Sequence, residues 1–437
     1  MSSSRPLLAI VGGVFAIVLA SLGGLGYLTL RTGPLAERLV REVDGLTRAR
    51  HPRPSHVTPA VPGTFAEHLE PLLGDVTRLY REQRERLQAP DGRWPCRAVV
   101  EGREPLSKLP PRCGETLEQG RALVARVLAA THAEEGGLPE GLRELASPNH
   151  PHAMDGRLAM LHVVRLAALE TRVRLEGGRA AEAVDTCVDA LALSRELALG
   201  GGLIGHMLSA TGYGDLYRPC AAALDAAPVE RKRSAVTQLS RLAEGFVPFS
   251  RTMKEESASV QLSFFGGLFP AELLGALPTG ARDKLLEGPV GAMGPDNPLD
   301  ARLSWRRTVK AFDALVTVAD LEPEARRRGF QALAAEEAGA LYRVDGPEVT
   351  GYERYADRAE LLRLQHDALM ALVEADLKRM ETGRWPEQLT SRARQSFVLE
   401  STEPGEARLK PCAPALNEHE LRVTTDTPSG SWGRPTP

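Results

Sequence analysis

The sequence predicts a mainly α-helical protein with an N-terminal transmembrane helix, an antiparallel helical domain and a small C-terminal α+β region. Composition is the first reason: Leu and Ala are abundant and aromatic residues make up only 5% of the 437 residues, which favours helix over sheet. The second is an uncharged run over 6–30, long enough to span a bilayer core of about 30 Å. The third is helical periodicity, since Leu362, His366, Leu369 and Val373 fall on one stripe.

The N-terminal run is interpreted as an uncleaved membrane anchor, residues 1–31. Arg5 precedes it and Arg31 closes it, and it is longer than the apolar core of about 7–15 residues in cleavable signals. A peptidase site after Val-Leu-Ala at 18–20 is the alternative. Four small residues repeat every four positions and form one smooth face of this helix: Gly12, Ala16, Ala20 and Gly24. Such a face would allow two anchors to pack as a homodimer. The alternative is that small residues are simply common in this segment.

Breaks in the remaining sequence define its organisation. Residues 32–63 are expected to be a juxtamembrane helix and a stiff linker, because "HPRPSHVTPAVPG" contains four prolines. An α-helical domain is expected over 64–383, with Gly or Pro at several helix breaks. The short stretches "QSFVLE" and "HELRVTTD" predict a small extended or α+β region over 384–426, followed by a disordered tail at 427–437.

Two of the five cysteines suggest a disulfide. Cys96 and Cys113 flank a Pro-rich loop, and closing it would stabilise the fold by about 3 kcal/mol in the chain-entropy model. A reduced pair in a cytosolic loop is the alternative. Cys187 shares a helical face with Ala183 and Leu191, so we expect it to be an unpaired core residue. A disulfide favours a location outside the cytoplasmic membrane, where the environment is oxidising.

Charge and motifs exclude several functional classes. Lys and Arg number 54 against 57 Asp and Glu, so no net field would recruit nucleic acid. "GGGLIG" at 200–205 matches the dinucleotide fingerprint, but a predicted helix precedes it where a strand is required, which favours a turn between helices. His132, Glu134, Glu135 and "HPH" at 150–152 lie in irregular sequence and are interpreted as a solvated loop. We therefore expect no cofactor, no metal and no recognisable catalytic residue.

The stretch "LSFFGGLFPAELLGAL" at 262–277 is the most apolar segment after the anchor. Buried core is the first interpretation, an apolar groove for a partner or lipid the second, and contact with the membrane surface the third. If this segment binds a partner, we expect Phe264, Phe265 and Phe269 to line the groove.

The tetrapeptide Gly-Arg-Trp-Pro occurs twice, each time after a charged amphipathic helix. Glycine suits the left-handed position that ends a helix, and the residue before a proline favours extended geometry. The tryptophan can then fold back over the last turn. Both copies are therefore predicted to be structural helix stops: Gly92, Trp94, Pro95, Gly383, Trp385 and Pro386.

Two segments resemble known proteins. "LEGGRAAEAVDTCVDALALSREL" at 175–197 resembles the second half of a tetratricopeptide hairpin, with Gly178, Ala183 and Ala190 at its turn and small packing positions. This resemblance implies a partly TPR-like helical domain. "ALVEADLKRMETGRWPEQLTS" is similar to the "GRWPxxL" segment of pseudopilin-type proteins and of uncharacterised membrane-anchored α-helical bacterial proteins. The second group implies a long helix that runs into a small C-terminal extended region, and no established activity.

These patterns predict a single-pass protein of the bacterial cytoplasmic membrane with the bulk of the chain outside the cytoplasm. The favoured function is a cell-envelope scaffold or adaptor that binds a protein partner, because a large helical domain on an anchor carries no recognisable reactive constellation. One alternative is an envelope hydrolase or transferase with an unrecognised site. The other is an accessory protein of a secretion or pilus system.

Overall fold

The computed structural model describes residues 23, 33–48, 51–87, 94–146, 151–265, 268–269, 271–287, 298–338, 349–403, 406–412 and 421–424. Apart from Gly23, the predicted anchor lies outside these ranges, as does the predicted tail. Among the helices of the described part, none combines the length and the apolar character needed to cross a bilayer.

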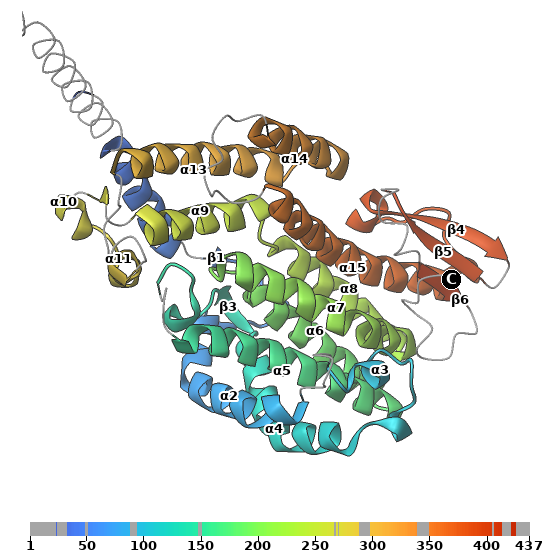
Figure 1. Ribbon diagram of the computed structural model, residues 1–437. Coiled ribbons are helices and arrows are strands. Elements are labelled where there is room, and N and C mark those ends of the chain that lie inside the picture. The colour runs from blue at the N-terminus through green and yellow to red at the C-terminus, as the bar shows by residue number, and fades with distance from the viewer. Residues whose placement is uncertain are drawn as a thin grey trace, which may run out of the picture.

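The prediction of a mainly helical chain is confirmed (Figure 1). The long helices are α2 (Phe65–Leu87), α4 (Pro111–Ala130), α5 (Pro151–Glu176), α6 (Ala180–Glu196), α7 (Gly202–Ala226), α8 (Val229–Glu244), α9 (Phe249–Phe265), α11 (Thr279–Glu287), α13 (Pro298–Ala319), α14 (Pro323–Ala338) and α15 (Val349–Thr382). Short helical segments are α3 (Arg97–Val100), α10 (Ala271–Leu274), η1 (Leu106–Lys108), η2 (Glu140–Leu142) and η4 (Arg392–Gln395). The strands are β1 (His51–Pro52), β2 (Val61–Thr64), β3 (Ala133–Gly136), β4 (Phe397–Glu403), β5 (Glu406–Pro411) and β6 (Leu421–Thr424).

Helices α5, α6 and α7 pack against one another and form the centre of the main core. Helices α2 and α4 lie on one side of them, and α8 and α15 on the other (Figure 1). Most of α6 between Ala183 and Leu197 is buried, because neighbours cover it on several faces. The glycine-rich motif at 200–205 lies at the junction of two helices: residues 200 and 201 belong to the turn after α6, and residues 202–205 form the first turn of α7.

Two disulfides join elements of this core. Cys187 of α6 bonds to Cys220 of α7, with Cα atoms 5.5 Å apart. The prediction that Cys187 is unpaired is therefore wrong: it is a small buried residue, but its face meets a cysteine on the next helix. Cys96 bonds to Cys113 at the start of α4, with Cα atoms 6.0 Å apart. Cys412, which follows β5, is exposed and free.

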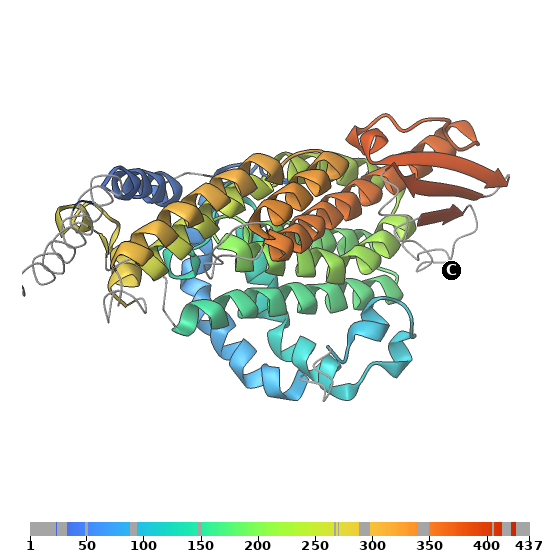
Figure 2. The same cartoon turned by 45° about the horizontal axis from the view of Figure 1, so that its top comes forward.

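A second layer of helices covers the bundle and has its own apolar clusters. Figure 2 shows α13, α14 and α15 lying side by side in this layer. The helical residues 33–48 join it through Leu39 and Val43, which belong to the same cluster as residues of α9, α11 and α13. Arg38 also forms two hydrogen bonds of 2.8 and 2.5 Å to the carboxylate of Asp313 on α13.

A small sheet lies at one end of the bundle, where β3 pairs antiparallel with β1 and parallel with β2. Residues 51–63 are consequently not the stiff spacer that the sequence predicts, because they pack against the helical domain. Arg53 donates hydrogen bonds to the carbonyls of Thr131 and Ala133, and His56 is only 1% exposed. Proline excludes helix from this segment, but it permits short strands at a sheet edge.

The C-terminal region forms a second sheet, in which β5 pairs antiparallel with both β4 and β6. Phe397 and Leu409 are buried, and β4 and β5 pack against α15 (Figure 1). The expected extended region over 384–426 contains this sheet and η4, although the described residues of that range end at 424.

Each Gly-Arg-Trp-Pro copy lies close to a helix end. Helix α15 ends at Thr382, and Gly383, with φ of 76°, donates its N–H to the carbonyl of Arg379 at 2.7 Å. Trp385 then covers Arg379, whose guanidinium lies 5.1 Å from the centre of the indole ring. In the first copy Gly92 is outside the described residues, while Trp94 is buried. In each copy the tryptophan is followed directly by the proline, Pro95 or Pro386.

Candidate functional site

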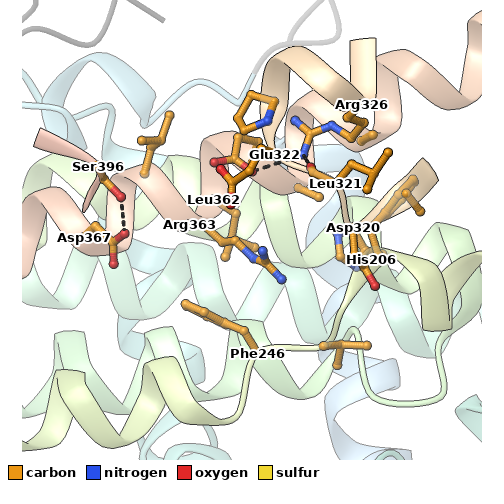
Figure 3. A pocket seen from close by; sticks show the side chains of 18 of the residues that line it. His206, Phe246, Asp320, Leu321, Glu322, Arg326, Leu362, Arg363, Asp367 and Ser396 are labelled. Atoms are coloured by element: carbon orange, nitrogen blue, oxygen red, sulfur yellow. Dashed lines mark hydrogen bonds and ion pairs between the residues drawn. The ribbon is translucent and has the colours of Figure 1, made fainter. Parts of the chain in front are cut away.

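A cavity of about 570 Å³ lies where the central bundle meets the second layer (Figure 3). It is lined by residues of α7, the α8–α9 turn, the α13–α14 turn, α15 and the segment that runs from η4 into β4. We call it the α7–α15 cleft. Its apolar lining includes Phe246, Leu321 and Leu362, and its volume falls in the range of sites that hold a small molecule or a short peptide segment.

His206 of α7 lies deep in the cleft lining and is 4% exposed. Its Nδ1 is 3.2 Å from the hydroxyl of Thr252, and its ring meets Phe249 edge-on. Within the described part of the chain, its Nε2 has no hydrogen-bond partner. Burial, reinforced by the charge of Arg363, lowers the pKa of His206 to about 4. The imidazole is therefore neutral near pH 7 and can offer a ligand a hydrogen bond but no charge.

Arg363 of α15 is the cation that stands out in the cleft. The three other arginines of the lining have acidic partners: Arg195 lies 3.0 Å from Glu196, Arg326 lies 3.3 Å from Glu360, and Arg392 lies 3.5 Å from Asp367. Arg363 is half-buried, and none of the residues that the structure describes makes a hydrogen bond or ion pair with it. Figure 3 shows its side chain reaching into the cavity. A carboxylate could bind this guanidinium without breaking an existing ion pair.

The cleft also holds a serine beside a carboxylate. The hydroxyl of Ser396 donates to Asp367 at 2.6 Å. Burial raises the pKa of Asp367, although the Ser396 hydroxyl and Arg392 oppose the shift. His206 lies on the other side of the cavity from Ser396 and Asp367 (Figure 3), so these residues do not form a nucleophile–base–acid triad.

The three phenylalanines of the predicted groove have different environments. Phe265 is 7% exposed and stacks on Trp305, with ring centres 5.9 Å apart. Phe269 packs on the same indole at 6.0 Å. Phe264 is 52% exposed. Phe265 and Phe269 therefore contribute to an apolar core cluster, and only Phe264 presents most of its ring to solvent.

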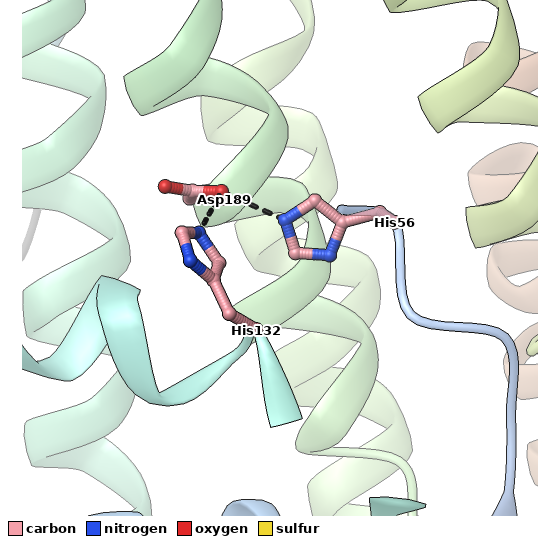
Figure 4. Close-up of side chains that lie close together, drawn as sticks. All are labelled: His56, His132 and Asp189. Carbon is pink, nitrogen blue, oxygen red and sulfur yellow. Dashed lines mark hydrogen bonds and ion pairs between the residues drawn. The ribbon is translucent and has the colours of Figure 1, made fainter. Parts of the chain in front are cut away.

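A second concentration of polar side chains lies at the end of the bundle near β3. His56, His132 and Asp189 could together hold a metal ion, since their ligand atoms lie within 4.8 Å of one another (Figure 4). Burial lowers the pKa of His56, whereas the hydrogen bond to Asp189 raises the pKa of His132. Burial opposes ionisation of Asp189, but its hydrogen bonds to both imidazoles outweigh this and lower its pKa.

Sequence reasoning missed both sites. The sequence groups His132 only with its neighbours Glu134, Glu135 and 150–152, yet its partners are His56 and Asp189, 76 and 57 positions away. The one local signal was Asp189 itself, an acid within the largely apolar run of α6. The side chains of His150 and His152 lie outside the described part.

Comparisons with protein-family models, with curated proteins and with solved structures find no match to this chain.

Proposed function

We propose that this protein is a membrane-anchored scaffold or adaptor of the bacterial cell envelope, and that it binds a protein partner in the α7–α15 cleft. Residues 6–30 would hold it in the cytoplasmic membrane, with the bulk of the chain outside. The observation that carries the proposal is Arg363, a half-buried cation that makes no hydrogen bond or ion pair with the described residues, in a cleft that also has apolar walls.

The partner would present an acidic group to this cleft. An aspartate, glutamate or C-terminal carboxylate could form a bidentate pair with the guanidinium of Arg363. Flanking apolar side chains of the partner would cover Phe246, Leu362 and the 42% exposed Leu321. Such a contact combines buried apolar side chains with one charged pair at a fixed position. Interface hot spots usually have this composition.

The disulfides support the proposed location. Disulfides persist in oxidising spaces and are rare in the cytosol, and four of the five cysteines are engaged in two of them. The uncharged N-terminal run supports the anchor independently, because its length suits a bilayer core. A bacterial protein with both features is placed most simply on the outer face of the cytoplasmic membrane.

Cys412 allows a direct test without a new attachment site. It lines the cleft, is exposed and is the cysteine left free by the two disulfides. A maleimide–benzophenone reagent on Cys412, activated in membranes of the native cell, should crosslink one specific partner for identification by mass spectrometry. Arg363→Gln should weaken capture about 10- to 100-fold, the effect of losing a charged hydrogen bond.

Arg358→Gln is the matched control, because Arg358 is an exposed arginine on the same helix that does not line the cleft. It should leave capture unchanged, and Cys412→Ser should abolish it. A partner captured equally well by the wild type and Arg363→Gln would refute the proposed role of the cleft. So would the absence of any specific crosslink.

One observation favours an envelope hydrolase as the second candidate. Ser396 and Asp367 are hydrogen-bonded inside the cleft, and burial raises the pKa of the carboxyl, as is common for residues of reactive sites. An active-site-directed fluorophosphonate would label Ser396 in a serine hydrolase. Labelling that is lost in both Ser396→Ala and Asp367→Asn would favour this candidate over the adaptor. An accessory role in a secretion or pilus system rests on the similarity of the "GRWPxxL" segment.

A further inference from the structure

The cluster of His56, His132 and Asp189 brings together three separate parts of the chain (Figure 4). His56 comes from the segment between β1 and β2, His132 from the turn after α4, and Asp189 from the middle of α6. The Nε2 atoms of His56 and His132 lie 2.7 and 3.0 Å from the same carboxylate oxygen, Oδ1 of Asp189. None of these three residues lines the α7–α15 cleft, and the proposed function does not use them.

In this cluster two imidazoles share one carboxylate oxygen as hydrogen-bond acceptor, which is unusual. An ionised carboxylate oxygen only accepts hydrogen bonds, so both imidazoles must present an N–H to Oδ1 of Asp189 for both contacts to be hydrogen bonds. Two nitrogens and one oxygen thus point toward one small region, and the imidazole N–H protons lie in it. The same three atoms are ligands that transition-metal ions take up once the nitrogens are deprotonated.

We propose that this cluster is a binding site for a divalent first-row transition-metal ion of the Zn²⁺ class, with Nε2 of His56, Nε2 of His132 and a carboxylate oxygen of Asp189 as ligands. Two imidazoles and one carboxylate form a ligand set used by zinc and non-haem iron centres that keep a coordination position open. Hard cations such as Mg²⁺ and Ca²⁺ prefer oxygen ligands, so we do not assign them to this site.

The ligand spacing requires only a small expansion. Metal–ligand bonds of about 2.0–2.1 Å in a tetrahedron place neighbouring ligand atoms about 3.3 Å apart. The two nitrogen–oxygen distances are 2.7 and 3.0 Å, so these two pairs must separate by a few tenths of an ångström, and the two nitrogens, which lie within 4.8 Å of one another, must reach the same spacing. Asp189 and His132 have the freedom to move, because their side chains are 19% and 30% exposed, whereas that of His56 is fully buried.

The backbone around the two histidines is already held in place. Arg53 binds the carbonyls of Thr131 and Ala133 on either side of His132. The carbonyl of His132 accepts hydrogen bonds from the hydroxyl of Ser55 and from the backbone N–H of Val61. The segments that carry His56 and His132 are therefore joined through several bonds, and binding a metal would not require either segment to be ordered first.

The tautomer of His56 would change on binding a metal. Its Nδ1 is buried and has no hydrogen-bond partner in the described part of the chain. Moving the ring proton from Nε2 to Nδ1 breaks no bond at Nδ1, but it breaks the hydrogen bond from Nε2 to Asp189, which the bond from Nε2 to the metal would replace.

Access and a fourth ligand come from the side of Asp189. This residue also lines a pocket of about 130 Å³ between α4, α5 and α6. Since a water molecule takes about 30 Å³ in the liquid, the pocket has room for water to reach the metal and complete its coordination. Asp185, one turn before Asp189 on α6, lines the same pocket. With Glu170 and Asp189 it gives the lining three acidic groups against two arginines, Arg121 and Arg174.

The experiment uses the full chain, purified in a mild detergent, stripped of metal with a chelator and titrated with Zn²⁺ by calorimetry. We expect one Zn²⁺ per chain with a Kd below about 1 µM. Asp189→Asn and His132→Gln should each weaken binding about 100-fold, because each removes a ligand and leaves two. His68→Gln is the matched control: His68 is a histidine of α2 that contacts the carbonyl of Pro62 and lies outside the cluster.

A spectroscopic readout keeps the test decisive if a variant fails to fold. Co²⁺ bound to the wild-type chain should give the intense visible absorption of a four-coordinate site, and Zn²⁺ should displace it. The inference is overturned if the wild type binds less than half an equivalent of Zn²⁺. Equal affinities of the wild type and a folded Asp189→Asn, or a Co²⁺ spectrum typical of the hydrated ion, would overturn it too.

Discussion

The substitution Glu196→Gln tests the charge network that ties the N-terminal segment to the bundle. The carboxylate of Glu196 is fully buried, with Oε1 2.6 Å from Arg53 Nε and 3.0 Å from Arg195 Nη2. Its Oε2 accepts the backbone N–H of Gly137 at 2.9 Å. Glutamine keeps the size and one acceptor but removes the only negative charge within this buried trio.

The expected loss of stability follows from burial. Breaking a buried ion pair by neutralising one partner costs about 3–5 kcal/mol, because it leaves an uncompensated charge in the interior. Here two guanidinium groups, Arg53 and Arg195, would lose their counter-charge, and both side chains are 1% exposed. For a chain of this size we expect the midpoint of thermal unfolding to fall by about 3–5 °C.

The pH dependence of the same network has a defined sign. Burial disfavours the ionised form of Glu196, but Arg53, Arg195 and the Gly137 N–H outweigh it and lower its pKa below the ordinary 4.5. The network's contribution is therefore present above about pH 4.5 and is lost as the pH falls through the lower pKa of the folded state. Between pH 7 and pH 5 the stability difference between the wild type and Glu196→Gln should stay constant.

Urea unfolding followed by circular dichroism measures this difference. Glu182→Gln is the control, because Glu182 lies on the same helix in an exposed pair with Arg179, and such pairs contribute about 0.5 kcal/mol or less. A loss below about 1 kcal/mol for Glu196→Gln, or one equal to that of the control, would show that the buried network does not anchor the segment.

Three further predictions follow from the core. Replacing Cys187 and Cys220 together by serine should lower the unfolding free energy by about 4 kcal/mol, since their bond closes a loop with a sequence separation of 33; urea unfolding with and without reductant checks this, and no difference would contradict the bond. Trp305→Phe should cost about 2–3 kcal/mol in chemical unfolding, because the buried indole N–H donates to Gln261 at 2.9 Å; a loss under about 0.5 kcal/mol would contradict this. Burial lowers the pKa of His366 to about 3 in the folded chain. As the pH falls below about 6.5, this histidine therefore takes up a proton in the unfolded chain but not in the folded chain. Stability should therefore drop by about 2 kcal/mol from this residue between pH 7 and pH 5, and the slope should flatten in His366→Gln.

Local patterns in the sequence were sufficient to predict the helices. The stripe of Leu362, Leu369 and Val373 predicts one face of α15, and these residues are buried in the main core. Such patterns describe one element at a time, because a helical period requires only the residues of that helix. They do not state which helix lies opposite, and for this reason the bond between Cys187 and Cys220 was not predicted.

The candidate sites were not predictable for the same reason. The α7–α15 cleft takes residues from Arg195 to Cys412, and no local motif relates them. In the segment 51–63 the prolines correctly exclude helix, but Arg53 and His56 pack because their partners, Glu196 and Asp189, lie on α6. Polar residues in a Pro-rich stretch predict a solvent-exposed segment. The buried acidic groups that bind them here are brought close only by the tertiary structure.

The packing of the N-terminal segment bears directly on the adaptor proposal. The helical residues 33–48 follow closely on the uncharged run 6–30 and lie against α9 and α13. Those two helices continue to the cleft, which is lined by Phe249 at the start of α9 and Ala319 at the end of α13. Along α13, Asp313, which binds Arg38, lies six residues and about 9 Å before Ala319, so a partner in the cleft would be held a short distance along a packed helix from this contact. A flexible spacer would let the cleft sample many positions relative to residues 33–48, whereas the packing of these residues on α9 and α13 fixes the cleft relative to them, which is what an adaptor requires.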